Sequence, residues 1–301
     1  MRWGDFRRSD NVEDRGDAGP SGGGFPGGGG IRLTGGVIAV VVIASLLFGA
    51  DPLQMLAMLA GESGPAPPPP QQQAAPRGYR PAPAPPAARD EAKEMVARVL
   101  GDTEDVWGAV FKTLGSRYDA PKLVLFRGAT QSACGRASAA VGPFYCPADR
   151  EVYLDTAFFN DLTRRFGAPG DFAQAYVVAH EVGHHVQNLM GIMGPYERQA
   201  QRTDARGRNA LSVRLELQAD CFAGVWGHFA QRRNLLEPGD VDEGLRAAAA
   251  VGDDRIQHAT QGRVVPESFT HGSAEQRMHW FKTGLDSGDV RKCDTFAART
   301  P

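Results

Sequence analysis

The pattern of apolar residues in the second half of the chain predicts two amphipathic helices. Between Asp171 and Gly191, apolar positions recur at helical spacing: Phe172, Ala175, Tyr176, Val178, Ala179 and Val182. This period indicates a helix with a broad buried face, capped by Asp171 and ended by Gly191. A second run with steps of three and four predicts a further helix: Leu211, Leu215, Ala219, Phe222, Trp226 and Phe229.

Shorter patterns around these helices predict one mixed α+β domain from Asp90 to Pro301. Residues 90–114 have a helical pattern, residues 122–126 and 151–155 are expected to be short strands, and most of the rest, including residues 241–251, is expected to be helical. A segment of this length is long enough for one globular domain with its own core.

Three segments of different composition precede this domain. Residues 1–30 are rich in glycine and charge without apolar periodicity, and we expect a disordered tail. Residues 31–50 are apolar except for Arg32, Thr34 and Ser45, which predicts one transmembrane helix. A cleaved signal peptide is the alternative, disfavoured by the long preceding region and a poor cleavage site. Residues 51–89, rich in proline, alanine and glutamine, are expected to form an extended linker.

The distribution of basic residues predicts the orientation of this anchor. The next basic residue after the apolar segment is Arg77. Five arginines, in contrast, lie before the segment or at its start: Arg2, Arg7, Arg8, Arg15 and Arg32. By the positive-inside rule, the amino terminus is expected to be cytoplasmic. The chain would then be a single-pass inner-membrane protein with an extracytoplasmic, periplasmic domain.

The cysteines agree with an oxidising compartment. All four follow the apolar segment: Cys134, Cys146, Cys221 and Cys293. An even count in such a compartment predicts two disulfides, for which three pairings exist. We favour Cys134 with Cys146 and Cys221 with Cys293. A zinc site built from cysteines is disfavoured, because no CxxC spacing occurs.

The sequence from His180 to His184 has the HExxH spacing of zinc hydrolases. On a helix, His180 and His184 lie one turn apart on the same face and can bind a single ion. Glu181 lies beside that ion, where its carboxylate can act as the general base for an attacking water. The motif therefore predicts one Zn²⁺ per chain and the hydrolysis of peptide bonds.

A catalytic zinc site needs a third protein ligand, and the second predicted helix offers two candidates. Glu216 and Asp220 are one turn apart on it. We favour Glu216 as the ligand, with Asp220 accepting a hydrogen bond from a histidine ligand to fix its tautomer. The reverse assignment, with Asp220 as the ligand, stays open.

HExxH followed by a helical ExxxD resembles the gluzincin pattern of thermolysin and the membrane-associated Ste24-like proteases. The strings HEVGHHVQ, from His180, and LSVRLELQADC, from Leu211, together with the glycine-rich start and single anchor, resemble the bacterial neutral zinc metallopeptidase family over nearly the whole chain. The resemblance implies a zincin-like fold and peptidase activity. In zincins a strand preceding the metal helix pairs with substrate, and residues 152–154 are in position to be that strand.

The same resemblance extends to the segment from Thr270 to Arg277. Ser273 and Gln276 form a predicted capping box, so a helix is expected to begin there with His271 in the preceding loop. A histidine and an arginine serve the active site of Ste24-like proteases in a similar arrangement, which implies that His271 stabilises the oxyanion of the tetrahedral intermediate. We expect Arg277 to hold a buried carboxylate.

The sequence thus predicts a membrane-anchored zinc metallopeptidase that acts on a peptide or protein. The formal net charge of −2 gives no indication of nucleic-acid binding. Two alternatives stay open: a zinc-binding scaffold or assembly factor with little turnover, and a zinc amidase that acts on a non-protein amide such as a cell-wall crosslink.

Overall fold

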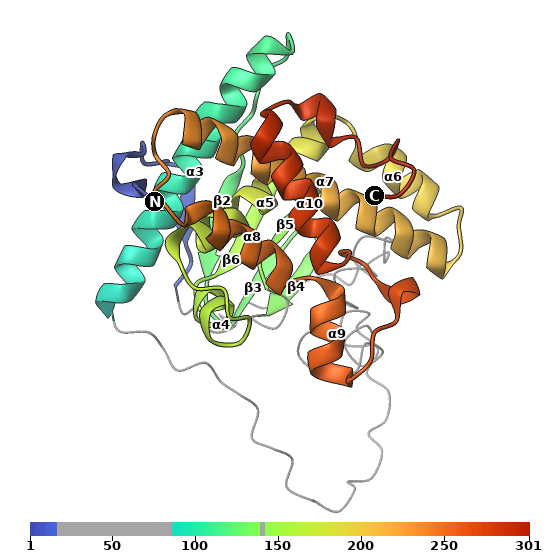
Figure 1. The fold of residues 1–301 in the computed structure, drawn as a ribbon. Helices are drawn as coiled ribbons and strands as arrows, with labels where there is room; N and C mark the ends of the chain where they lie inside the picture. The colour runs from blue at the N-terminus through green and yellow to red at the C-terminus, as the bar shows by residue number, and fades with distance from the viewer. Residues whose placement is uncertain (17–85, 139–141) are drawn as a thin grey trace, which may run out of the picture.

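The computed structural model describes residues 1–16, 86–138 and 142–301, and in these segments it is mostly helical with a small sheet (Figure 1). The helices are α3 (Pro86–Thr113), α4 (Phe158–Arg164), α5 (Asp171–Leu189), α6 (Met193–Ala200), α7 (Ala205–Arg232), α8 (Asp240–Ala250), α9 (Asp253–Gln261) and α10 (Ala274–Ser287). Short 3₁₀ helices are η1 (Trp3–Asp5), η3 (Pro266–Ser268) and η4 (Val290–Cys293). The predicted α+β class is confirmed.

The main sheet has the strand order β1-β2-β6-β5, formed by Val12–Asp14, Lys122–Phe126, Glu151–Asp155 and Phe144–Cys146. β1, β2 and β6 are parallel, whereas β5 pairs with β6 in the antiparallel direction. β3 (Ala129–Ser132) and β4 (Gly135–Ser138) form a separate hairpin. The strands predicted at 122–126 and 151–155 are confirmed.

One expectation about this sheet is wrong. Residues 152–154 belong to β6, which is hydrogen-bonded to β2 on one side and to β5 on the other. Both edges of β6 are therefore occupied, so an extended substrate cannot pair with it. Among the described strands, β5 forms the edge of the sheet on this side. The pattern of apolar residues predicts that a strand is buried, and it carries no information about the order of strands.

The helices pack around α5, which contacts α3, α7 and α8, while α10 lies along α7. The largest fully buried side chains are spread over these helices and include Trp107, Phe172, Tyr176, Phe222, Trp226 and Phe281. α7 and α10 approach closely at Gly224 and Gly284, because a Cβ atom at either glycine would collide with the backbone of the other helix. α7 and α10 thus form one tightly packed pair.

The expectation of a disordered tail is wrong for residues 1–16, which pack against α3 and extend the sheet (Figure 1). Ser9 donates a backbone hydrogen bond to Ala97, and Leu123 donates one to Asn11. Phe6 is only 3 % exposed. Sequence reasoning missed this segment because its partners lie about a hundred positions away, which leaves no local period. Residues 17–30 lie outside the described residues.

The predicted transmembrane helix at 31–50 also lies outside the described residues, as does the linker up to residue 85. Within the segments that the structure describes, no helix is both long enough and apolar enough to cross a membrane. The described part of the domain begins with α3, four residues before the predicted boundary at Asp90.

A pair of glycines on α3 tests whether residues 1–16 belong to the fold. A Cβ atom at Gly101 would collide with the carbonyl oxygen of Arg7, whereas a Cβ atom at Gly108 would meet no atom within 4 Å. We expect Gly101→Ala to lower the free energy of unfolding by about 1–3 kcal/mol. Gly108→Ala should leave it unchanged or raise it by up to about 1 kcal/mol, since alanine favours helix.

Urea unfolding of both variants measures this difference. The same pair should then be compared in a chain that lacks residues 1–16, where the cost of Gly101→Ala should disappear. An equal cost with and without those residues would show that the collision is not with the amino-terminal segment.

Candidate metal centre

Three side chains from two helices converge on one point. α5 carries His180 and His184, and α7 carries Glu216. The Nε2 atom of His180 lies 3.3 Å from Oε2 of Glu216, and Nε2 of His184 lies 3.5 Å from Oε1 of the same carboxylate. One ligand atom of each residue lies within 4.8 Å of the others. Two imidazole nitrogens and a carboxylate in this arrangement are a donor set that suits zinc.

A close crossing of the two helices brings these ligands together. A Cβ atom at Gly183 would lie 2.9 Å from the carbonyl oxygen of Ala219, so only glycine lets α5 approach α7 this closely. Gly183 precedes His184 directly, and Ala219 is three residues after Glu216. The glycine within the motif is therefore explained by packing, and its effect is to set the distance between the ligands.

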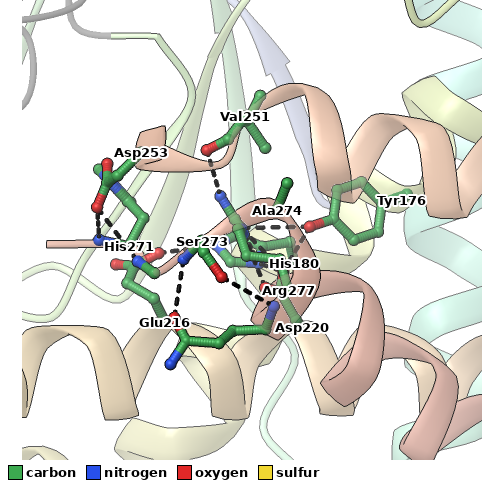
Figure 2. Close-up of polar contacts among 12 residues, drawn as sticks. Tyr176, His180, Glu216, Asp220, Val251, Asp253, His271, Ser273, Ala274 and Arg277 are labelled. Atoms are coloured by element: carbon green, nitrogen blue, oxygen red, sulfur yellow. Dashed lines mark hydrogen bonds and ion pairs between the residues drawn. The ribbon is translucent and has the colours of Figure 1, made fainter. Parts of the chain in front are cut away.

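A buried carboxylate orients His180. Oδ1 of Asp220 lies 2.8 Å from Nδ1 of His180, and it also accepts a hydrogen bond from the hydroxyl of Tyr176. Arg277 donates to both oxygens of Asp220, from Nε at 2.8 Å and from Nη2 at 2.9 Å. Figure 2 shows Arg277 between Asp220, Tyr176 and the backbone of Val251. Because Nδ1 of His180 faces a carboxylate, it carries the proton and leaves Nε2 free to bind a metal.

The charges in this network shift several pKa values. Burial opposes ionisation of Asp220, but Arg277 and His180 lower its pKa to about 2. Burial lowers the pKa of His180, but the charge of Asp220 outweighs it and raises the pKa to about 10. The pKa of Glu216 is held well below its usual value by His184 and His271, against the effect of burial. The metal-free site therefore attracts positive charge.

His184 is oriented by an amide. Its Nδ1 atom lies 2.8 Å from Oε1 of Gln187, one turn further along α5. The neighbouring His185 points away from the cluster and contacts the hydroxyl of Tyr145 and the carbonyl of Asp119. The two ligand histidines thus have different supports, a paired carboxylate for His180 and a neutral glutamine for His184.

Glu181 is buried beside the ligands without being one of them. It is 6 % exposed, and burial raises its pKa, while the neighbouring His180 and His184 lower it. Among the described residues, no side-chain hydrogen bond holds its carboxylate. A carboxylate with a raised pKa that no protein donor occupies is suited to taking up a proton from water.

His271 lies in the loop before α10, and the predicted capping box of Ser273 and Gln276 is confirmed. Nδ1 of His271 is 3.1 Å from Oδ1 of Asp253, whose other oxygen accepts backbone hydrogen bonds from Thr270 and His271. Burial lowers the pKa of His271, but Glu216 and Asp253 raise it. Asp253 thus holds the histidine in place (Figure 2).

The structure therefore brings the predicted site residues together, each in one of three positions. His180, His184 and Glu216 meet directly, Asp220 and Arg277 support His180, and His271 lies close enough to interact with Glu216. Sequence reasoning treated Tyr176 only as an apolar position of the helix and missed its hydrogen bond to Asp220. It assigned no role to Gln187 and Gln218. A signal was present, because Tyr176 and Gln187 lie one turn from a ligand on a largely apolar helix.

Two further features lie outside this centre. Both favoured disulfides are confirmed, Cys134 with Cys146 and Cys221 with Cys293. A second group of carboxylates, formed by Asp171, Asp240 and Glu243, lies at the start of α5. The amino group of Met1 is 2.9 Å from Asp171 and 3.2 Å from Asp240. This ammonium group offsets part of the negative charge of that cluster.

The site defines a class of proteins, those with an HExxH helix and a glutamate on a following helix. Within that class, the chain belongs to the family described as "Putative neutral zinc metallopeptidase", whose model matches residues 1–296.

Two relatives illustrate the extent of this similarity. The chain is 48 % identical over 301 residues to the uncharacterized protein YpfJ of Escherichia coli, covering 98 % of this chain and 99 % of that protein. It is 50 % identical over 201 residues to an uncharacterized protein of Mycobacterium tuberculosis, covering 63 % of this chain and 67 % of that protein. No solved structure matches the chain significantly.

The choice between Glu216 and Asp220 as third ligand can be tested by zinc binding. We expect Glu216→Gln to weaken zinc binding by more than about 100-fold, whereas Asp220→Asn should weaken it by about 10–100-fold, as the loss of a supporting hydrogen bond does. Competition with a chromophoric chelator measures both, with Glu197→Gln on the exposed face of α6 as the control. A full loss of zinc in Asp220→Asn with retention in Glu216→Gln would reverse the assignment.

Proposed function

We propose that the chain is a zinc-dependent metallopeptidase that cleaves peptide bonds with an attacking water. One observation carries the proposal: both Nε2 atoms of the motif histidines face the Glu216 carboxylate, while no side chain in the described part of the chain donates a hydrogen bond to the carboxylate of Glu181 beside them. A structural ion-pair cluster has no need for an unpaired buried carboxylate. A hydrolytic site requires one as a base.

The proposed roles follow from the geometry. Zinc held by His180, His184 and Glu216 would supply a Lewis acid that polarises the scissile carbonyl and lowers the pKa of water. Glu181 takes a proton from the attacking water and transfers it to the amine that leaves. Its raised pKa favours this role, because a base with a pKa closer to neutrality can also act as an acid.

His271 is proposed to donate a hydrogen bond to the oxyanion that develops on the substrate carbonyl. Its Nδ1 atom is held by Asp253, so Nε2 is the atom available to a substrate. The charges of Glu216 and Asp253 raise its pKa and so favour the protonated form. A donor fixed in advance in this way stabilises the transition state more than the ground state.

The sheet edge supports an extended peptide as substrate. β5 runs beside α5 and forms the edge of the sheet among the described strands. We propose that a substrate adds to β5 as a further strand, which is a common way for proteins to bind extended peptides. This replaces the expectation that β6 has this role.

An extracytoplasmic location is proposed from the cysteines. The described chain contains two disulfides and no free cysteine, which is typical of an oxidising compartment. Because β1 pairs with β2, residues 1–16 are proposed to lie on the same side of the membrane as the domain. This differs from the cytoplasmic amino terminus that the arginines suggested.

Replacement of Glu181 by glutamine tests the proposed activity. We expect Glu181→Gln to retain one zinc per chain and to lower the rate of peptide cleavage by about 10²–10⁴-fold, because the general base is lost. The full chain is assayed against casein and a peptide library at matched zinc content. Zinc binding without cleavage by either protein would favour the scaffold, and cleavage of cell-wall fragments alone would favour the amidase.

The same assay separates the role of His271 from that of the base. His271→Phe is expected to lower kcat by about 10²–10³-fold with little change in KM or zinc content, since an oxyanion donor acts in the transition state. A change confined to KM would contradict this role.

Labelling of single introduced cysteines tests the proposed location. Asp10 and Glu275 are both exposed, one in the amino-terminal segment and one on α10. We expect a membrane-impermeant maleimide to label Asp10→Cys and Glu275→Cys equally in intact spheroplasts. Labelling of Asp10→Cys only after lysis would place the segment on the opposite side from the domain, and labelling of both only after lysis would place the domain in the cytoplasm.

A further inference from the structure

Two buried glutamines connect His184 to the carboxyl-terminal part of the chain. Oε1 of Gln187 accepts from Nδ1 of His184 at 2.8 Å, and Nε2 of Gln187 donates to Oε1 of Gln218 at 3.1 Å. Nε2 of Gln218 in turn donates to the carbonyl oxygen of Cys293 at 2.9 Å. The exposed fractions of Gln187, Gln218 and Cys293 are 0 %, 5 % and 0 %. Because all three residues are buried and their polar groups are paired with one another, each depends on the others for its hydrogen bonds.

The direction of this chain of hydrogen bonds is fixed by backbone carbonyls. A carbonyl only accepts, so the amide nitrogen of Gln218 must face Cys293, and its oxygen then faces Gln187. Gln187 is fixed in the same way, because its nitrogen also donates to the carbonyl of Leu215 at 2.7 Å. The oxygen of Gln187 must therefore face His184. His184 carries its proton on Nδ1 as a result, which leaves Nε2 as the metal-binding atom.

A disulfide holds the far end of this chain. Cys293 lies at the end of η4 and is bonded to Cys221, three residues after Gln218 on α7. The carbonyl of Cys293 thus remains beside the Gln218 side chain only while η4 remains on α7. The disulfide joins η4 to the same helix that supplies the ligand Glu216.

We propose that Gln187, Gln218 and the Cys221–Cys293 disulfide form a positioning relay that sets the tautomer and orientation of His184. The proposal rests on the proposed function in that it takes His184 to be a zinc ligand. It adds that the zinc affinity of the site depends on a disulfide whose sulfur atoms are not ligands. Asp220 and Arg277 support His180 separately, so the relay acts on one ligand only.

The chain offers a matched control for this idea, because its second disulfide lies in a different region. Cys134 and Cys146 connect the β3–β4 hairpin to β5, and among the described residues no hydrogen bond links them to a ligand histidine. We expect the double variant Cys221→Ser, Cys293→Ser of the full chain to bind zinc about 10–100-fold more weakly than the wild type, as the loss of outer hydrogen bonds to a metal ligand does. Cys134→Ser, Cys146→Ser should bind zinc as the wild type does.

Two glutamine variants test the relay without altering a disulfide. Gln187→Met and Gln218→Met should weaken zinc binding by about 10–100-fold, while Gln257→Met should not. Gln257 is also buried, at 4 % exposure, and its side chain makes two hydrogen bonds, to Ser268 and Val265 in the segment that follows α9. It controls for the general cost of losing a buried amide. Chelator competition gives the affinity, and the ¹⁵N shifts of the His184 ring in the metal-free protein report its tautomer.

The outcomes separate this proposal from the proposed function. If the wild type binds no zinc, the metal site itself is wrong. The wild type could bind zinc and cleave peptides while the Cys221/Cys293 and glutamine variants bind zinc as tightly as the wild type does. That result would overturn the relay and leave the proposed function standing. An equal loss in both disulfide variants would also overturn it, because the effect would then be a general loss of stability.

Discussion

The arrangement of the centre depends on the hydrogen bonds and the ion pair that the buried carboxylate of Asp220 makes. Asp220 is 0 % exposed and receives hydrogen bonds from Tyr176, His180 and Arg277. Burying a carboxylate without partners costs several kcal/mol, and removing one partner of a buried ion pair typically costs about 3–5 kcal/mol. The donors to Asp220 come from α5 and α10, and Asp220 itself lies on α7. Its carboxylate therefore has all its hydrogen bonds only when the three helices are correctly aligned along one another. The same alignment brings Glu216 to the histidines.

The balance of charge in the centre favours the binding of a cation. Glu181, Glu216, Asp220 and Asp253 are four carboxylates in or beside the site, and Arg277 is the permanently charged side chain that faces them. Without a metal, this excess of negative charge is met by protons, which is why the pKa of His180 rises to about 10. Protons and zinc compete for Nε2 of that histidine, so zinc binding must release a proton. On the Nε2 side of His180, the carboxylate that faces the proton is that of Glu216, which is also the proposed metal ligand.

Local patterns in the sequence predicted much of the site. The spacing of His180 and His184, the period of α7 that presents Glu216, and the capping box at Ser273 each depend on residues within one or two helical turns. Residues that act across the fold were harder to predict. Gln187 and Gln218 are thirty-one positions apart and meet only because α5 crosses α7 at Gly183. The order of strands, which leaves β5 at the edge, likewise depends on pairing that no local period encodes.

The arginines at the start of the chain have a physical explanation other than the positive-inside rule. The positive-inside rule assumes that basic residues near an apolar segment are free to interact with the membrane and its charge. In this structure Arg7 lies 2.6 Å from Glu104, and Arg8 lies 3.1 Å from Glu94, both on α3. β1 pairs with β2 beside them, and Lys122 pairs with Glu13. Arg7 and Arg8 balance carboxylates of α3, so packing within the domain is sufficient to explain their charge, and the predicted cytoplasmic amino terminus stays a prediction.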